Sequence, residues 1–162
     1  ACLPAVDIGT DEAVKSLISG SVIKCAILVN GKAKCWGSNA WGALGLGNTD
    51  SWGDDPSDMG ANLPYLNIGT GRTIKDISIP GNYGCALADD NQIRCWGLFG
   101  SNPADGYIIG DQPNQMEDHL IPLTLPAGRS AKSLTGNCAI LDTINFIAGN
   151  FYQTELLIPG VS

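Results

Sequence analysis

The sequence predicts an all-β fold, a partial β-propeller of about three four-stranded antiparallel blades. Three observations predict it. A unit of roughly 50 to 60 residues recurs along the 162-residue chain, and each copy contains four short strand candidates. The 21 glycines and 9 prolines, with scattered Asn and Asp, divide the chain into short apolar runs joined by turns. Four strands per unit at this period are typical of propeller blades, and the pattern does not favour long helices.

The repeat is clearest at an offset of sixty positions. Residues 25–37 read CAILVNGKAKCWG, and residues 85–97 read CALADDNQIRCWG. The same offset aligns further pairs, namely Leu3-Pro4 with Leu63-Pro64, Ile8-Gly9-Thr10 with Ile68-Gly69-Thr70, and Lys15 with Lys75. We place the blade repeats at residues 3–62, 63–120 and 121–159, within a single repeat domain that spans 1–162.

Each unit supplies its four strand candidates in the same order. The first lies around VDIG or LNIG, the second around AVKSLI or TIKDISI, the third around CAIL or CALA, and the fourth around KAKCW or QIRCW. The third unit is degraded: Cys138 matches Cys85, but NFIAGN stands where CWG is expected. Phe146 or one of its neighbours therefore occupies the place of a partner for Cys138.

The cysteines are predicted to clip the hairpins between the third and fourth strands. Asn30-Gly31 is a strong hairpin signal, because glycine tolerates the positive φ that a tight turn requires. With Gly31 in the left-handed position of a three-residue loop, Cys25 and Cys35 lie opposite each other on adjacent strands. Their Cα atoms would then be about 4.5 Å apart, near the lower limit for a disulfide.

The same geometry pairs Cys85 with Cys95, with Asn91 in the place of the glycine. Cys2 and Cys138 are left over and could pair with each other by elimination. The alternatives are that one or both are buried free thiols or bond to another chain. Disulfides are expected in an oxidising compartment, either outside the cell or in an organelle lumen. The chain opens at Ala1 with no signal-like segment, which suits a mature protein after removal of a targeting peptide and equally suits part of a longer protein.

Charge and residue spacing exclude several functions. A net charge of -7 disfavours binding to nucleic acid and to anionic membrane surfaces. No apolar run approaches the roughly 18 residues of a membrane span. There is no CxxC pair, His119 lies far from every cysteine, and the acidic run DSWGDDPSD lacks the alternating spacing of a calcium loop. We therefore expect no metal, no cofactor and no catalytic residues.

Two tryptophans are candidate binding residues. Trp36 and Trp96 follow cysteines at equivalent positions of the repeat and are expected to pack within the blades. Trp41 and Trp52 lie in connecting loops, and their counterparts in the second unit are not aromatic. Either could stack on a sugar or anchor in a partner protein, and either could equally cover a blade edge.

The stretch from CWGSNAWGALGLGNTD to YGCAL resembles the repeat of the regulator-of-chromosome-condensation family, in the cysteine-bearing form found in many bacterial and algal proteins. The resemblance is dense in residues 20–97 and fades after about residue 98. It implies a seven-bladed propeller, of which about three blades are present here. Many members carry His before the CAL strand, where this chain has Lys24, Gly84 and Asn137, and this departure puts ordinary blade geometry in doubt.

The best-known activity of that family is guanine-nucleotide exchange on a small GTPase, assisted by chromatin contact. That activity uses a complete propeller with basic extensions, so an acidic chain of three blades is a poor match. An arc of three blades leaves apolar sheet faces that a neighbouring blade would bury in a closed ring. We expect a non-catalytic structural or interaction subunit that docks onto a larger extracellular or luminal assembly.

The expected partners are other protein subunits of that assembly or a second copy of the chain. If the source is algal, the resemblance points to a photosynthetic complex and the thylakoid lumen. A lectin-like glycan-binding module is the alternative function, and it rests mainly on Trp41 and Trp52.

Overall fold

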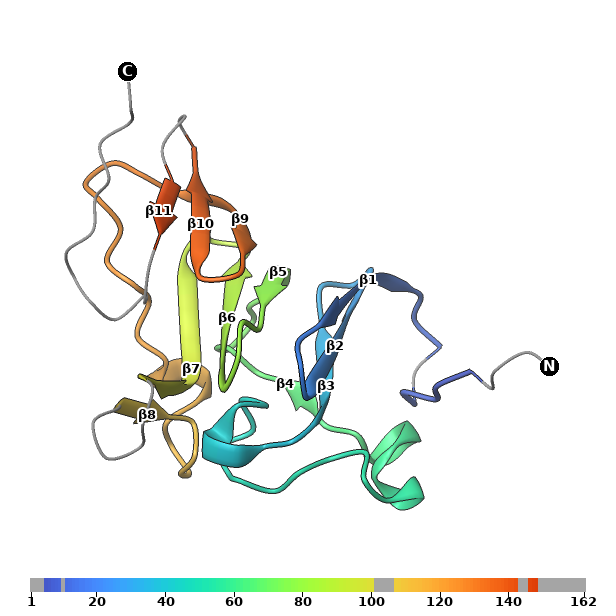
Figure 1. The fold of residues 1–162 in the computed structure, drawn as a ribbon. Coiled ribbons are helices and arrows are strands. Elements are labelled where there is room, and N and C mark those ends of the chain that lie inside the picture. Colours follow the sequence, from blue (N-terminus) through green and yellow to red (C-terminus); the bar gives the residue numbers. More distant parts are fainter. Residues whose placement is uncertain (1–4, 10, 101–106, 143–145, 149–162) are drawn as a thin grey trace.

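The structure, a computed structural model, describes residues 5–9, 11–100, 107–142 and 146–148, and these form three antiparallel sheets (Figure 1). The first sheet has the order β1 (Val14–Ser19), β2 (Ile23–Leu28), β3 (Ala33–Gly37) and β4 (Tyr65–Leu66). The second has the order β5 (Ile74–Ser78), β6 (Tyr83–Ala88), β7 (Ile93–Phe99) and β8 (Tyr107–Ile109). The third has the order β11 (Phe146–Ala148), β10 (Cys138–Leu141) and β9 (Ala131–Thr135).

The sheets follow one another as an arc, with the second between the first and the third (Figure 1). The only helices among the described residues are four short 3-10 turns: η1 (Ala40–Gly42), η2 (Pro56–Asp58), η3 (Gly60–Asn62) and η4 (Glu117–His119). None of them has the length or the apolar character needed to cross a membrane. The predicted all-β class is confirmed, although the third sheet has three strands in the described part of the chain rather than four.

The strand expected around VDIG or LNIG differs from the prediction. Residues 5–8 form no strand, and in the second unit the strand is Tyr65–Leu66, which begins one residue before LNIG. It pairs with β3 of the first sheet, with Leu66 opposite Ala33. The second unit therefore begins by completing the edge of the sheet before it. At the start of the third unit, the Leu123 amide makes the matching contact by donating to the Ile93 carbonyl of β7 at 2.8 Å. Strand β8, which was not predicted, pairs with the end of β7, where Ile109 lies opposite Gly97 as Trp52 lies opposite Gly37 in the first unit.

The two predicted disulfide-linked hairpins are present. Cys25 lies opposite Cys35 and Cys85 opposite Cys95, with Cα separations of 4.1 and 4.0 Å. Gly31 has φ +80° and Asn91 has φ +61°, so the asparagine takes the left-handed turn position that glycine holds in the first hairpin. All four cysteines are fully buried. Local turn chemistry thus sets the register that brings the thiols together.

Removing one hairpin disulfide is expected to destabilise the chain by about 2 to 3 kcal/mol, because the bond closes a small loop in the unfolded chain. The change is the double substitution Cys25→Ala and Cys35→Ala, which avoids leaving a buried free thiol. Urea unfolding followed by circular dichroism measures the difference. A midpoint equal to that of the wild-type chain would contradict it.

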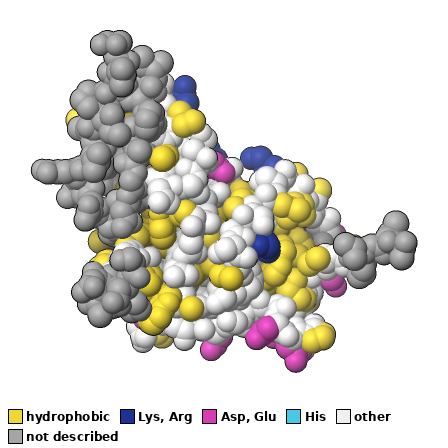
Figure 2. All heavy atoms as spheres, in the orientation of Figure 1, with side chains coloured by type: hydrophobic (Ala, Val, Ile, Leu, Met, Phe, Trp, Pro, Cys, Tyr) yellow, Lys and Arg dark blue, Asp and Glu magenta, His cyan; other side chains and the backbone are white. Residues whose placement is uncertain are grey.

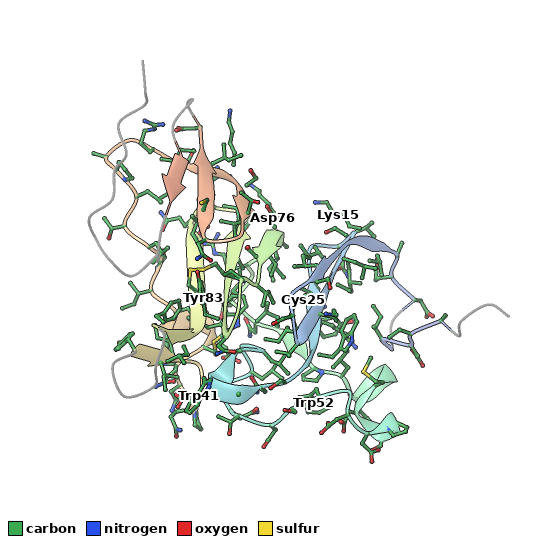
Figure 3. The ribbon with its side chains drawn as sticks, in the orientation of Figure 1. Lys15, Cys25, Trp41, Trp52, Asp76 and Tyr83 are labelled. Atoms are coloured by element: carbon green, nitrogen blue, oxygen red, sulfur yellow. A yellow bond between two sulfur atoms is a disulfide. The ribbon has the colours of Figure 1, made fainter. Side chains whose placement is uncertain are left out.

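The hydrophobic core forms two layers, one between each pair of neighbouring sheets. In the first layer, Ile23, Cys25 and Ile27 of the first sheet pack against residues of the second sheet. In the second layer, the other face of the second sheet packs against the third. In Figure 3, Cys25 lies on the side of the first sheet that faces the second, and Tyr83 on the side of the second that faces the third. The first and second sheets thus each use the disulfide face to contact the next sheet.

Polar contacts join the second and third sheets at one end. The Leu134 amide donates to Asp76 Oδ2 at 2.8 Å, and the Ser78 hydroxyl donates to the Gly136 carbonyl at 2.9 Å. The Tyr83 hydroxyl donates to Asn137 Oδ1 at 2.8 Å. Burial, with a smaller contribution from Cys138, raises the pKa of Tyr83 to about 12. The neutral phenol is therefore the form that the folded chain favours.

We expect the stabilisation that depends on the neutral Tyr83 phenol to be present below pH 10 and lost as the pH rises toward 12. The sign follows because the pKa in the folded chain lies above the ordinary value of 10.0. Ultraviolet titration of phenolate absorbance should show a late component near pH 12 that is absent in Tyr83→Phe. A titration of Tyr83→Phe that retains this late component would refute the assignment.

Candidate functional site

The same apolar contact joins both pairs of neighbouring sheets. Ile74 and Ile77 on β5 are buried against the first sheet, and β5 packs beside β2. Ala131 and Leu134 hold the equivalent positions on β9, which packs beside β6, and they are buried against the second sheet. The first strand of a sheet therefore supplies two apolar side chains to the sheet that precedes it.

A backbone hydrogen bond accompanies this contact at both junctions. The Ile74 amide donates to the Gly31 carbonyl at 2.7 Å, and the Ala131 amide donates to the Asn91 carbonyl at 3.2 Å. Both acceptors are the positive-φ residues of the disulfide-linked hairpins. The hairpin of one sheet thus fixes the first strand of the next, which makes the junction a repeated structural unit.

The first sheet carries the same strand positions without a preceding sheet in the described residues. Val14 and Leu17 on β1 are equivalent to Ile74 and Ile77, as their pairing with β2 shows. Leu17 is 72% exposed where Ile77 is 3% exposed, and Val14 is 44% exposed where Ile74 is 3% exposed. We call the face of the first sheet that bears Val14 and Leu17 the open face. Hydrophobic side chains are visible on the molecular surface over this sheet (Figure 2).

Two tryptophans at equivalent repeat positions differ in burial, because a preceding sheet covers the second sheet and none of the described residues form one before the first. Trp96 is fully buried, and its Nε1 donates to the Ala43 carbonyl of the first unit at 3.0 Å. Its ring lies against Gly84, where an added Cβ would come within 2.7 Å of the ring. Trp36 is only half-buried, and the residue equivalent to Gly84 is Lys24. The expectation that these tryptophans pack within the blades holds fully for Trp96 and in part for Trp36.

The N-terminal segment covers part of the open face. Lys34 on β3 is buried, and its Nζ donates to the Ile8 carbonyl at 2.7 Å. The same ammonium group lies 4.6 Å from the centre of the Tyr65 ring, a cation–π contact. The Gly60 amide donates to the Asp7 carbonyl at 3.1 Å. The exposed part of the open face is therefore the strip along β1.

The third sheet has an exposed face at the other end of the arc. Ala139 and Leu141 on β10 are buried toward the second sheet, so Cys138 and Ile140 alternate onto the opposite side. Ile140 is 46% exposed, whereas Ile27 and Leu87 at the equivalent positions of β2 and β6 are fully buried. We call the face that bears Cys138 and Ile140 the far face.

The third sheet has no hairpin disulfide, because Ala148 lies opposite Cys138. This identifies the neighbour of Phe146 that takes the place of the second cysteine. Cys138 is not bonded to any residue that the structure describes and is partly exposed. The predicted pairing with Cys2 involves a residue outside the described part of the chain and stays a prediction.

The structure does not bring Trp41 and Trp52 together as a pair. Trp41, at φ +64°, lies in η1, a segment that packs near β7 and β8, while Trp52 bridges to Gly37 at the edge of the first sheet (Figure 3). Trp52 lines a pocket of about 220 Å³ from which Trp41 is absent. The pocket is lined by Gly45, Leu46, Asn48, Trp52, Pro64, Tyr65, Asn67, Met116 and Glu117.

Two features distinguish this pocket. The Trp52 Nε1 is buried and has no hydrogen-bond partner among the described residues. Glu117 has φ +61°, a conformation that side chains rarely adopt, whereas the equivalent residue of the first unit is Gly60 at φ +69°. A repeat position that glycine fills without strain thus carries a carboxylate at the pocket wall. Sequence comparison of the two units shows this substitution, but it does not show that the carboxylate adjoins Trp52.

The acidic run around η2 is explained by turn formation. Asp55 caps η2, accepting from the Ser57 amide and hydroxyl, and these hydrogen bonds lower the pKa of Asp55. Asp58 accepts from the Gly53 and Asp55 amides. No group of three or more potential metal-ligating side chains occurs within residues 5–9, 11–100, 107–142 and 146–148. His119 lies at the end of η4.

Comparison with known proteins identified related folds but no related sequences. No family model matches the chain, and a search of curated proteins found no match. Human WBSCR16 matches with a TM-score of 0.55 and 15% identity, over 86% of this chain and 32% of that one.

Two structures of yeast Prp20 also match. One, from Saccharomyces cerevisiae and described with its binding properties to Gsp1p and histones, gives a TM-score of 0.48 and 16% identity, over 82% of this chain and 31% of that one. The other is yeast RCC1 (Prp20) bound to Kap60. It gives a TM-score of 0.46 and 17% identity, over 79% of this chain and 29% of that one. The chain thus spans about a third of the length of these proteins. Its fold is that of a partial regulator-of-chromosome-condensation (RCC1) β-propeller.

Proposed function

We propose that this chain is a non-catalytic structural subunit that docks onto a larger protein assembly through the open face of its first sheet. The observation that carries the proposal is the difference in exposure at equivalent repeat positions. Leu17 and Val14 are exposed, while the side chains that match them in the second and third sheets are buried by the preceding sheet. Apolar side chains at a repeated interface position are the expected mark of a surface that is covered in the working assembly.

The repeat also indicates how strong such a contact would be. Burying an aliphatic side chain such as Leu17 contributes about 1.5 to 3 kcal/mol. Val14 adds a second apolar contact, and its amide is the counterpart of the Ile74 amide that donates to Gly31. The open face therefore offers both apolar area and a directional backbone donor to a partner.

The two disulfides indicate an oxidising compartment. We propose that the assembly is extracellular or lies in an organelle lumen. For an algal source, the resemblance to cysteine-bearing algal repeats favours a photosynthetic complex in the thylakoid lumen. Immunogold localisation or fractionation of the source organelle distinguishes these compartments.

The docking function is tested by purifying the tagged chain from its native source and measuring the mass of the particle that contains it. Wild-type chain should run in a particle larger than the chain itself, and Leu17→Asp should release it. Ile121→Asp is the matched control, because Ile121 is also a highly exposed apolar residue but lies outside the first sheet. Equal particle masses for wild type and Leu17→Asp would reject the open face as the docking surface.

A lectin-like function is the second candidate, and the pocket beside Trp52 favours it. Sugar-binding sites combine an aromatic surface with polar groups that bind hydroxyls. Here Trp52 and Tyr65 supply the aromatic surface, and Asn48, Asn67 and Glu117 supply the polar groups. The unpartnered Trp52 Nε1 is a donor that a hydroxyl could satisfy.

Tryptophan fluorescence during titration with a panel of soluble oligosaccharides tests this second candidate. A saturable change that disappears in Trp52→Phe and persists in Trp41→Phe would support glycan binding at the pocket. Absence of any saturable fluorescence change across the panel would reject the lectin-like function.

A further inference from the structure

We infer that the open face of one chain takes the far face of a second copy, so that two chains associate head to tail. The inference rests on the proposed function, because it names the partner of the docking surface. Its basis is that this chain exposes both halves of the interface that it already forms twice internally.

The two halves are recognised from the junctions within the chain. At each junction, the first strand of one sheet packs beside the second strand of the preceding sheet: β5 beside β2, and β9 beside β6. The apolar side chains on the receiving side include Ile27 and Leu87, both fully buried. The open face contains a first strand, β1, and the far face contains a second strand, β10, and no other sheet of the described residues packs on either face.

The exposed side chains on these two strands match the internal junctions. Leu17 and Val14 hold the positions of Ile77 and Ile74, and Ile140 holds the position of Ile27 and Leu87. Placing β1 of one copy beside β10 of another would bury Leu17 and Ile140 together, as Ile77 and Ile27 belong to one apolar cluster within the chain. Each copy can therefore supply the surface that its neighbour lacks.

This interface is heterologous, because the two surfaces that meet are different. A contact of the open face with another open face would instead be isologous and would join two equivalent faces. Each internal junction joins two different faces, because the disulfide face of one sheet packs against the opposite face of the next. Heterologous contacts form rings when the rotation closes and longer arrays when it does not. A ring and a longer array both have masses that are multiples of the chain mass. Both depend on contacts in which Leu17 of one copy meets Ile140 of the next.

Sedimentation equilibrium of the purified, oxidised chain tests the inference, with the single variants Leu17→Asp and Ile140→Asp and the control Ile121→Asp. Wild type and Ile121→Asp should show concentration-dependent multiples of the 16.9 kDa mass. Each single variant should dissociate at least about tenfold more readily, because every head-to-tail contact in its sample contains one aspartate at a buried position. Circular dichroism checks that each aspartate variant is folded. If one of them does not fold, the serine variant at the same position, Leu17→Ser or Ile140→Ser, takes its place in the experiment.

The decisive step is to mix the two single variants. The intact far face of Leu17→Asp can dock on the intact open face of Ile140→Asp, so the mixture should form a dimer and no larger species. Isologous association would leave Ile140→Asp as associated as wild type, and that result would overturn the inference. A wild-type chain that stays monomeric at all concentrations would also overturn it. The native-source experiment is independent of this result, so loss of a larger particle in Leu17→Asp would still support docking to another protein.

Discussion

Substituting Ile77 by aspartate is expected to prevent folding, whereas the same substitution at Leu17 is expected to leave the isolated chain folded. The two residues occupy the same position of the repeat and differ in whether a preceding sheet covers them. An aspartate at position 77 would bury a carboxylate in the apolar layer between the first and second sheets. Burying an unpaired charge costs several kcal/mol, a large part of the 5 to 15 kcal/mol that stabilises a typical domain.

Far-UV circular dichroism and thermal unfolding of both variants measure this difference. Leu17→Asp should unfold within a few degrees of wild type, because a mostly exposed position tolerates a charge. Ile77→Asp should show no cooperative transition. Similar destabilisation in the two variants would mean that Leu17 is buried in the isolated chain, in conflict with the open face.

Replacing Trp96 by alanine is expected to destabilise the chain by about 3 to 5 kcal/mol, the range for removing a buried aromatic side chain. The loss has two parts. The indole fills the space between the first two sheets, and its Nε1 satisfies the Ala43 carbonyl. Its removal leaves a cavity and an unpaired acceptor in the segment that links those sheets.

Trp36→Ala is the matched control, since Trp36 follows a hairpin cysteine in the same way but is only half-buried. It should lower stability by about 1 kcal/mol in the isolated chain. Denaturant unfolding of both variants gives the comparison. A loss at Trp36 equal to that at Trp96 would show that the first sheet is as well covered as the second.

Local features of the fold could be predicted from the sequence. The hairpins follow from Asn30-Gly31, from Asn91 in the second unit, and from cysteines spaced to face each other across a three-residue loop. The internal repeat predicted the second hairpin, because the cysteines of the first hairpin recur at an offset of sixty with Asn91 in the place of Gly31. These features depend on neighbouring residues only, which is why reading the chain locally was sufficient.

Features that depend on contacts between units could not be predicted. Tyr65–Leu66 completes the sheet before it, since its pairing with β3 is set by how two units pack and not by its own residues. The sequence placed Trp41 and Trp52 in loops but could not show that only Trp52 adjoins Tyr65 and Glu117 in a pocket. It predicted that an incomplete arc has exposed faces, but assigning Leu17 and Ile140 to those faces required the sheet registers.

Hydrogen exchange of the β1 amides, followed by mass spectrometry in the isolated and the assembled chain, tests the central claim most directly. The peptide that contains Val14 and Leu17 should exchange faster in the isolated chain than in the assembly, because β1 pairs with β2 on one edge only and no sheet of the described residues covers its open face. The peptide that contains Ile74 and Ile77 should be protected in both states, because the first sheet already covers it. An assembled particle in which the Val14 and Leu17 peptide exchanges as fast as in the isolated chain would contradict the claim that the open face is the docking surface.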